Sequence, residues 1–249
     1  MASAPLFLGP FGRGAKQVVK RTNEWENSSN QLRRLQNSLG KDEPRECMNT
    51  YVINQYINLA ATMVANRELE QAFHVYEEVL KYNSNLYWVQ NELGNVLTEL
   101  GRLDDAKICF FKAVESCPDF ATAWDNLGYV FYAQGKKWLA IQQLEMAIGA
   151  DPNFKRAYIH LGQVLIEVHL FDRAAVAYWR ALDLAPNDVH THRKLAYVYY
   201  KQGLFGLAIE TLRYASQLEP DNPNDYHNLA LALQGKDHAE EAKHCYDRA

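Results

Sequence analysis

Hydrophobic positions from residue 53 onward fall into short blocks with helical spacing. Residues 121–154 show the pattern most completely. In their first block, apolar residues follow the i, i+3, i+4, i+7 spacing of one helical face: Trp124, Leu127, Gly128 and Phe131. Gln134-Gly135 interrupts this block, and a second block ends at Asp151-Pro152, because a proline disfavours helix in the residue before it. The pattern predicts two helices joined by a tight turn.

This unit recurs along most of the chain with a fixed period of 34 residues. Leu followed by Gly or Ala stands at 59–60, 93–94, 127–128, 161–162, 195–196 and 229–230. An alanine comes twelve residues after each pair, at Ala72, Ala106, Ala140, Ala174, Ala208 and Ala242. Proline closes four units, at Pro118, Pro152, Pro186 and Pro220. This period with these residues is the signature of the tetratricopeptide repeat, a pair of antiparallel helices.

The predicted fold class is therefore all-α, a right-handed tetratricopeptide superhelical solenoid of about six 34-residue helix-turn-helix repeats. The expected repeats are 53–86, 87–120, 121–154, 155–188, 189–222 and a truncated 223–249. We expect residues 1–52 to be an irregular, basic N-terminal segment with a short helix at Gln31–Leu39. The array ends inside a predicted second helix at Ala249, which indicates a fragment or truncated copy of a longer protein.

Small residues at the Leu-Gly/Ala place and at the later alanine let the two helices of a repeat approach closely. Gly101, Gly135 and Gly203 fall at the turn between helices, where glycine tolerates a positive φ. Four tryptophans are expected mostly in the core or between repeats: Trp88, Trp124, Trp138 and Trp179. Of these, Trp88 is the best candidate for a contact with a partner.

Charge and cysteine usage narrow the class of protein. The net charge of −4 argues against nucleic acid as a partner, although residues 1–40 hold six Lys and Arg against two Glu. Cys47, Cys109, Cys117 and Cys245 form no C-x-x-C pair, which favours reduced thiols in the cytoplasm or nucleus. The basic start suits either a plain tail or an organelle transit peptide. No apolar run reaches the ~20 residues that cross a bilayer, so no membrane association is expected.

No motif for catalysis or cofactor binding is found. A glycine-rich phosphate loop, G-x-S-x-G and H-E-x-x-H are all missing from the sequence. His190 and His192 resemble a metal pair, but residues at i and i+2 of a helix point about 200° apart. We therefore expect no catalytic residue, no metal and no cofactor in this chain, and packing as the role of His192.

A tetratricopeptide array offers a concave surface built from its first helices. The place just before each Leu-Gly/Ala pair holds Asn58, Glu92, Asn126, His160, Lys194 and Asn228. An asparagine amide carries both a donor and an acceptor, so it can bind a peptide backbone without reading the side chains. The alternative is that these asparagines bond only within their own or adjacent helices. Four residues earlier stand Asn54, Trp88, Thr122, Arg156, His190 and Asn224.

Several segments resemble, without gaps, the tetratricopeptide region of the O-linked N-acetylglucosamine transferases, which move N-acetylglucosamine from a UDP-sugar to Ser and Thr of proteins. They include YINLAA (56–61), LGRLDDAK (100–107), AWDNLGYVFYAQG (123–135), FDRAAVAYWRAL (171–182) and YYKQGLFGLAI (199–209). The resemblance implies a ladder of asparagines that grips extended peptide segments. Asn58, Asn126 and Asn228 keep that ladder, whereas Glu92, His160 and Lys194 depart from it. The family's catalytic domain follows the repeats and is not in this sequence.

The resemblance therefore implies a protein–protein interaction scaffold that is the substrate- and adaptor-binding arm of such a transferase. The alternative is a stand-alone adaptor or co-chaperone, whose basic clamp would bind a terminal carboxylate. Asn95, Asn126 and Arg156 fall at clamp-like places, but Asn91 replaces the key lysine and His160 a second basic group. Extended peptide segments of other proteins are the expected partners under both interpretations, and homodimer formation stays open.

Overall fold

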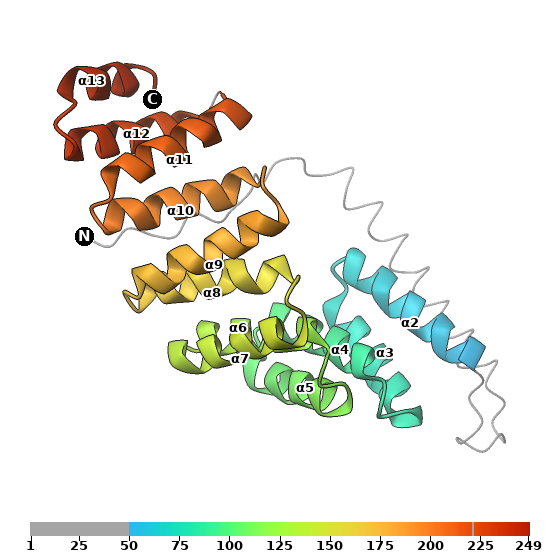
Figure 1. Cartoon of the computed structure of the whole chain (residues 1–249). Helices are drawn as coiled ribbons and strands as arrows, with labels where there is room; N and C mark the ends of the chain where they lie inside the picture. Colours follow the sequence, from blue (N-terminus) through green and yellow to red (C-terminus); the bar gives the residue numbers. More distant parts are fainter. Residues whose placement is uncertain (1–49, 221) are drawn as a thin grey trace, which may run out of the picture. The chain divides into compact units, whose positions relative to one another are not determined.

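A computed structural model describes residues 50–220 and 222–249, and this part of the chain folds into twelve α-helices without a strand (Figure 1). The expected helix at Gln31–Leu39 lies outside the described residues. The first described helix begins at Thr50, inside the segment that was expected to be irregular. The helices are α2 (Thr50–Ala65), α3 (Leu69–Tyr82), α4 (Tyr87–Glu99), α5 (Leu103–Ser116), α6 (Ala121–Ala133), α7 (Lys137–Ala150), α8 (Lys155–Glu167), α9 (Phe171–Leu184), α10 (Val189–Lys201), α11 (Phe205–Leu218), α12 (Pro223–Gly235) and α13 (Ala239–Asp247).

The chain divides into two compact units, Met1–Arg102 and Leu103–Ala249. Among the described residues of the first unit, α3 packs against both α2 and α4. In the second unit each helix from α5 to α13 packs against the next one along the chain, and α6 also contacts α8. Figure 1 shows the resulting antiparallel pairs, such as α6 with α7 and α8 with α9. The predicted all-α class is confirmed.

Small residues set the distance between the two helices of a pair. All six repeat alanines are at most 1% exposed: Ala72, Ala106, Ala140, Ala174, Ala208 and Ala242. A Cβ added to Gly128 would lie 2.7 Å from the Cγ of Leu144, and one added to Gly162 would lie 2.7 Å from the Cζ of Tyr178. Such contacts are closer than packed atoms adopt, so the two helices approach this closely only because no side chain stands at these places.

The turn inside each pair needs a left-handed residue. Gly101, Gly135 and Gly203 have φ values of 75–77°, as their positions in the sequence predict. The equivalent places in the other three repeats hold Arg67, His169 and Asp237, with φ values of 60–65°. The repeat geometry therefore imposes the same backbone conformation on residues that carry a Cβ, at a cost in strain that glycine avoids.

A second recurring feature joins one repeat to the next. The fourth residue of a repeat donates a side-chain hydrogen bond to the carbonyl oxygen six residues earlier, at distances of 2.7–3.3 Å. The pairs are Gln90 with Ser84, Trp124 with Pro118, Tyr158 with Pro152, His192 with Pro186 and Tyr226 with Pro220. The acceptor is a carbonyl near the end of the preceding helix, where no helical amide is available to bond it. His192 thus has the packing role that its position predicted.

The expectation for the tryptophans is wrong for Trp138, which is 62% exposed. Trp88 and Trp124 are half-buried, and Trp179, although 52% exposed, donates a hydrogen bond of 2.6 Å to the hydroxyl of Tyr199 in the next repeat. Asp104 and Asp172 occupy the place equivalent to Trp138 in neighbouring repeats. That place lies on the outer side of a second helix, so the position in the repeat, and not the residue type, decides the exposure.

Candidate functional site

The first helices of the second unit present one row of side chains, which we call the first-helix face: the exposed and half-buried residues of α6, α8, α10 and α12. Asn126, His160 and Lys194 are half-buried on this face, and Asn228 is exposed. In the first unit, Asn58 and Glu92 are exposed on α2 and α4. Glu92 accepts hydrogen bonds from Asn91 at 3.2 Å and from Asn95 at 3.4 Å. The residues expected to form a ladder therefore differ in their surroundings.

Asn126 belongs to a network centred on a buried carboxylate. Asp125 is 0% exposed, and its Oδ2 accepts a hydrogen bond from the Nε of Arg156 at 2.7 Å. The Nη2 of Arg156 reaches the Oδ1 of Asn126 at 3.2 Å. A bound peptide that used this amide oxygen would compete with the guanidinium, so Asn126 is in part a structural residue, as the alternative interpretation stated.

His160 completes this network from α8. Its Nδ1 lies 2.8 Å from the Oδ1 of Asp125, so both carboxylate oxygens have a partner on the next repeat. An ion pair whose acid is buried and fully hydrogen-bonded resists exchange with a ligand. Arg156 and His160 are thus committed to Asp125, which argues against their use as a clamp for a terminal carboxylate.

A second buried carboxylate joins α10 to α12. Asp225 is 1% exposed, and it accepts hydrogen bonds from the Nε and Nη2 of Arg193 at 2.7 and 2.8 Å. Glu219 also accepts from Nη2 at 2.7 Å. The hydrogen bond to Asp225 and the contact with Glu219 raise the pKa of the Arg193 guanidinium, whose positive charge is fully matched.

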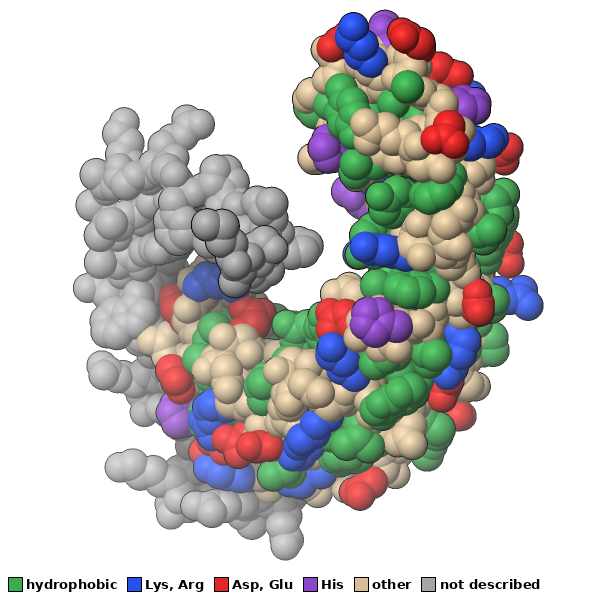
Figure 2. Space-filling model, turned by 90° about the vertical axis from the view of Figure 1, so that its left-hand side faces the viewer, with side chains coloured by type: hydrophobic (Ala, Val, Ile, Leu, Met, Phe, Trp, Pro, Cys, Tyr) green, Lys and Arg blue, Asp and Glu red, His purple; other side chains and the backbone are tan. Residues whose placement is uncertain are grey.

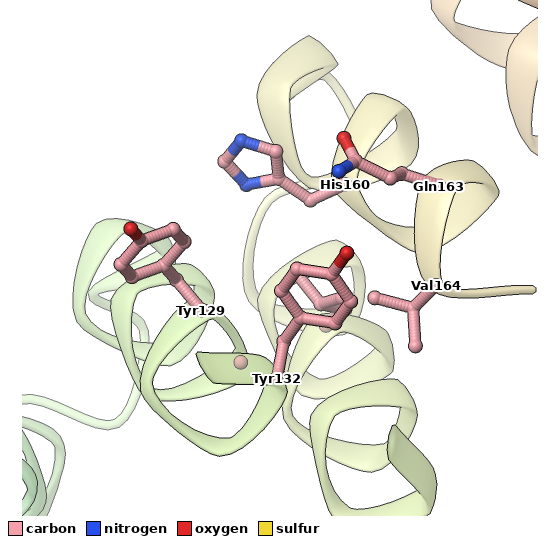
Figure 3. A pocket seen from close by; sticks show the side chains of 7 residues that line it. Tyr129, Tyr132, His160, Gln163 and Val164 are labelled. Carbon is pink, nitrogen blue, oxygen red and sulfur yellow. The ribbon is translucent and has the colours of Figure 1, made fainter. Parts of the chain in front are cut away.

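The face is hollowed between α6 and α8. The lining residues of this hollow are Gly128, Tyr129, Tyr132, Leu144, His160, Gln163 and Val164. Figure 3 shows Tyr129 and Tyr132 projecting from α6 towards the side where His160 and Gln163 project from α8. The hollow measures about 80 Å³. The Tyr132 hydroxyl bonds to Glu167 and Gln163, and burial together with the bond to Glu167 raises its pKa. Burial opposes ionisation of Glu167, but hydrogen bonds from Tyr132 and Lys137 outweigh it and lower the pKa of this carboxyl.

An equivalent hollow lies between α10 and α12, two repeats further along. Its volume is about 230 Å³, and it is lined by Arg193, Ala196, Tyr197, Tyr200, Lys201, Leu212, Asn228 and Leu231. Leu212 is 3% exposed and forms the floor, whereas Tyr197 is 47% exposed at the rim. The Nζ of Lys201 lies 5.3 Å from the centroid of the Tyr197 ring, a cation–π contact.

Several of these residues are not indicated by the sequence. The repeat pattern indicates the places of Asn126, Arg156, His160, Lys194 and Asn228, but neither buried aspartate nor the tyrosines. One signal was available, because Lys194, Tyr197 and Lys201 follow the i, i+3, i+7 spacing of a single helical face. Stacking the place three residues after the ladder place would have found Tyr129 and Tyr197 together.

Further observations on residues 50–220 and 222–249 concern metal ligands, thiols, membrane spans and surface charge. This part of the chain holds no group of three His, Cys, Asp or Glu side chains that could bind a metal ion. Cys117 and Cys245 are free thiols. None of the described helices is long and apolar enough to cross a membrane. On the face that Figure 2 shows, acidic, basic and hydrophobic side chains of the described residues are mixed and form no continuous basic surface.

Comparison with known proteins identifies the class. A family model described as TPR repeat matches residues 94–135, and one described as tetratricopeptide repeat matches residues 159–223. The chain therefore carries a tetratricopeptide-repeat region. The structure of MamA from Desulfovibrio magneticus matches with a TM-score of 0.62 and 23% identity over 70% of this chain and 98% of that one. YrrB, described as a TPR protein with an unusual peptide-binding site, matches with a TM-score of 0.57 and 24% identity over 74% and 91%. Identities this low establish the fold alone.

Curated relatives are of several kinds. The peroxisomal targeting signal receptor of Kluyveromyces lactis is 24% identical over 205 residues, which cover 68% of this chain and 36% of that protein. The UDP-N-acetylglucosamine–peptide N-acetylglucosaminyltransferase of Giardia intestinalis is 23% identical over 166 residues, which cover 66% and 11%. The cell division cycle protein 27 homolog of Caenorhabditis elegans is 32% identical over 100 residues, which cover 40% and 13%. The chain thus spans between about a tenth and a third of the length of these relatives.

Proposed function

We propose that this chain is a protein–protein interaction scaffold whose first-helix face binds extended peptide segments of other proteins. The observation that carries the proposal is the pair of equivalent hollows on that face, each rimmed by a tyrosine that is about half exposed. Tyr129 is 50% exposed and Tyr197 is 47% exposed, although both lie on the inner helices of a repeat array. Exposed aromatic side chains beside a hollow are typical of the anchor points of protein interfaces.

A selection of linear peptides from a display library, with the whole chain as bait, tests this proposal. Enriched peptides should bind the wild-type chain and lose affinity for a variant that carries Tyr129→Ala and Tyr197→Ala. The matched control carries Trp138→Ala and Val176→Ala, two side chains that are each 62% exposed on second helices. Retained binding in this control supports the proposal. Failure to enrich any peptide, or loss of binding in the control alone, overturns it.

Two finer functions remain for the same face. The first is the substrate- and adaptor-binding arm of a UDP-N-acetylglucosamine–peptide N-acetylglucosaminyltransferase, supported by the resemblance of the repeats and by the relative in Giardia intestinalis. Asn58, Asn126 and Asn228 would then be ladder residues. Reading the transcript beyond Ala249 tests it, because an in-frame glycosyltransferase sequence supports the arm and a stop codon contradicts it.

The second is a stand-alone adaptor, for which the peroxisomal receptor and the cell division cycle homolog provide equal support. A co-chaperone type of adaptor would bind the acidic C-terminal peptide of a chaperone. Because Arg156 and His160 are bound to Asp125, we expect no clamp of this kind. Calorimetry with such a peptide checks the point, since measurable heat would restore the co-chaperone interpretation.

A further inference from the structure

The two hollows are built from the same places of the repeat but differ in what closes them. Tyr129 and Tyr132 line the first hollow, and Tyr197 and Tyr200 stand two 34-residue periods later in the second. Leu144 and Leu212 are likewise equivalent at the two floors. Because the two hollows occupy the same places of the repeat, their lining residues can be compared position by position.

The α6–α8 hollow is closed by partners from within the chain. Gln163 and Glu167 of α8 both bond to the hydroxyl of Tyr132, and the ammonium of Lys137 pairs with Glu167 at 3.0 Å. Its polar groups are therefore satisfied internally. The remaining volume of about 80 Å³ is enough for a few water molecules, each of which occupies ~30 Å³ in the liquid.

The α10–α12 hollow has lost these closing groups. Leu231 stands at the place of Gln163, and Gly235 at the place of Glu167. The volume grows to about 230 Å³, and an apolar side chain, Leu231, replaces the amide of Gln163 in the lining. This volume is below the ~300 Å³ at which small-molecule sites begin, so it suits one large side chain better than a cofactor.

Positive charge without a carboxylate partner lies on the helix that carries this hollow: Lys201 is part of the lining, and Lys194 lies outside it on α10. Lys194 and Lys201 lie on the same face of α10 as Tyr197, and within the described residues no carboxylate pairs with either ammonium group. Arg193, in contrast, is neutralised by Asp225 and Glu219. In a chain with a net charge of −4, two such lysines beside an apolar hollow are complementary to a local acidic and apolar ligand.

We propose that the α10–α12 hollow binds a large apolar side chain, preferably aromatic, of an extended peptide, and that Lys194 and Lys201 pair with acidic residues flanking it. This proposal rests on the proposed function and names the class of peptide. Tyr197 and Tyr200 stack against the inserted ring, Leu231 and Leu212 contact its edge, and Asn228 is placed to bond the peptide backbone beside it. Two lysines are too few for the series of phosphate contacts that nucleic acid requires.

Peptides enriched in the display selection provide the first readout. They should contain Phe, Tyr, Trp or Leu next to Asp or Glu, and a fluorescein-labelled copy should lose affinity as the salt concentration rises. Enriched peptides without this pattern, or with basic flanks, overturn the proposed peptide class while leaving the scaffold function intact. Tighter binding of a labelled single-stranded RNA than of any peptide also overturns it.

Variants of the hollow provide the second readout, by fluorescence anisotropy with the labelled peptide. Tyr197→Ala should weaken binding about tenfold, and Lys201→Gln about three- to fivefold with a smaller salt dependence. Leu231→Gln restores one of the closing groups of the α6–α8 hollow, the amide at the place of Gln163, and should weaken binding, whereas Lys112→Gln, an exposed lysine of α5, should not. Circular dichroism shows whether each variant is folded. Equal affinities of Lys201→Gln, Leu231→Gln and Lys112→Gln for the peptide would overturn the proposal.

Discussion

Arg156 of α8 donates a hydrogen bond of 2.7 Å to Asp125 of α6, a carboxylate with no exposed surface. The two residues belong to neighbouring repeats, and Arg156 lies on the face that would bind a partner whereas Asp125 is buried beneath it. The polar residues of this face therefore have two roles, one structural and one in ligand binding. Some hold the repeats together, and the others are left for a ligand.

Removing the carboxylate of Asp125 should destabilise the second unit. Asp125→Ala leaves Arg156 and His160 without their acceptor, but both are partly exposed and regain water, so the expected cost is about 1–3 kcal/mol. Urea unfolding followed by circular dichroism measures it as a lower midpoint. Asp119→Ala, in an exposed turn, is the control, and an equal shift in both variants would contradict the structural role of Asp125.

Asp188 should make the stability of the array depend on pH below its usual pKa of 3.8. Burial acts to raise this pKa, but hydrogen bonds from Lys155 and from the backbone N–H of Thr191 outweigh it and lower the pKa in the folded chain. A lowered pKa in the folded state adds stability above the unfolded value, and this stability is lost as the pH falls through the folded value.

Asp188→Asn keeps the helix cap but not the charge. It should therefore be less stable than the wild-type chain at pH 7, by ~0.5–1 kcal/mol, and the difference should shrink towards pH 3. Thermal unfolding at both pH values measures the difference. A gap that stays constant between pH 7 and pH 3 would show that the ionisation of Asp188 does not contribute.

The bond from Tyr158 to the carbonyl of Pro152 should contribute to cohesion between repeats. Tyr158→Phe removes the hydroxyl, which donates at 3.1 Å, and should lower the midpoint of unfolding by the equivalent of ~0.5–1.5 kcal/mol. Tyr197→Phe is the matched control, because no described residue forms a hydrogen bond with its hydroxyl. The midpoint of the control should remain unchanged.

Substitutions at two of the left-handed turn residues should change the stability of the chain in opposite directions. His169→Gly should stabilise the chain by ~0.5–1 kcal/mol, because its φ of 60° is strained for a residue with a Cβ. Gly135→Ala should destabilise it by ~1–2 kcal/mol, and a Cβ there meets no atom within 4 Å, so backbone strain is the only cause. Differential scanning calorimetry of both variants checks the signs, and two shifts in the same direction would exclude the explanation.

The sequence predicts the fold well because every structural requirement repeats. Each repeat alanine is buried and each turn residue has a positive φ, so six copies support one interpretation. The residue type is less informative where several side chains can satisfy the same structural requirement, such as a hydrogen bond to the carbonyl six residues earlier. Gln90, Trp124 and His192 all donate to the equivalent carbonyl although their side chains have little else in common.

The site could not be predicted to the same extent because its ion pairs do not follow the period. Arg156 reaches back 31 residues to Asp125, whereas Arg193 reaches forward 32 residues to Asp225. Each arginine stands at a different place in its repeat, so stacking equivalent places does not reveal the pairing. Asn126 is hydrogen-bonded to Arg156, whereas Asn228 lines a hollow. This difference depends on the conformations of neighbouring side chains, which the sequence does not specify.

Photo-cross-linking tests the central claim, that the first-helix face binds peptides, most directly. The tightest peptide from the display selection is synthesised with benzoylphenylalanine in place of its large apolar residue, irradiated with the whole chain, and mapped by mass spectrometry. We expect cross-links to α10 and α12, at Tyr197, Tyr200 or Leu231. Cross-links confined to the second helices α7, α9 and α11 would contradict it.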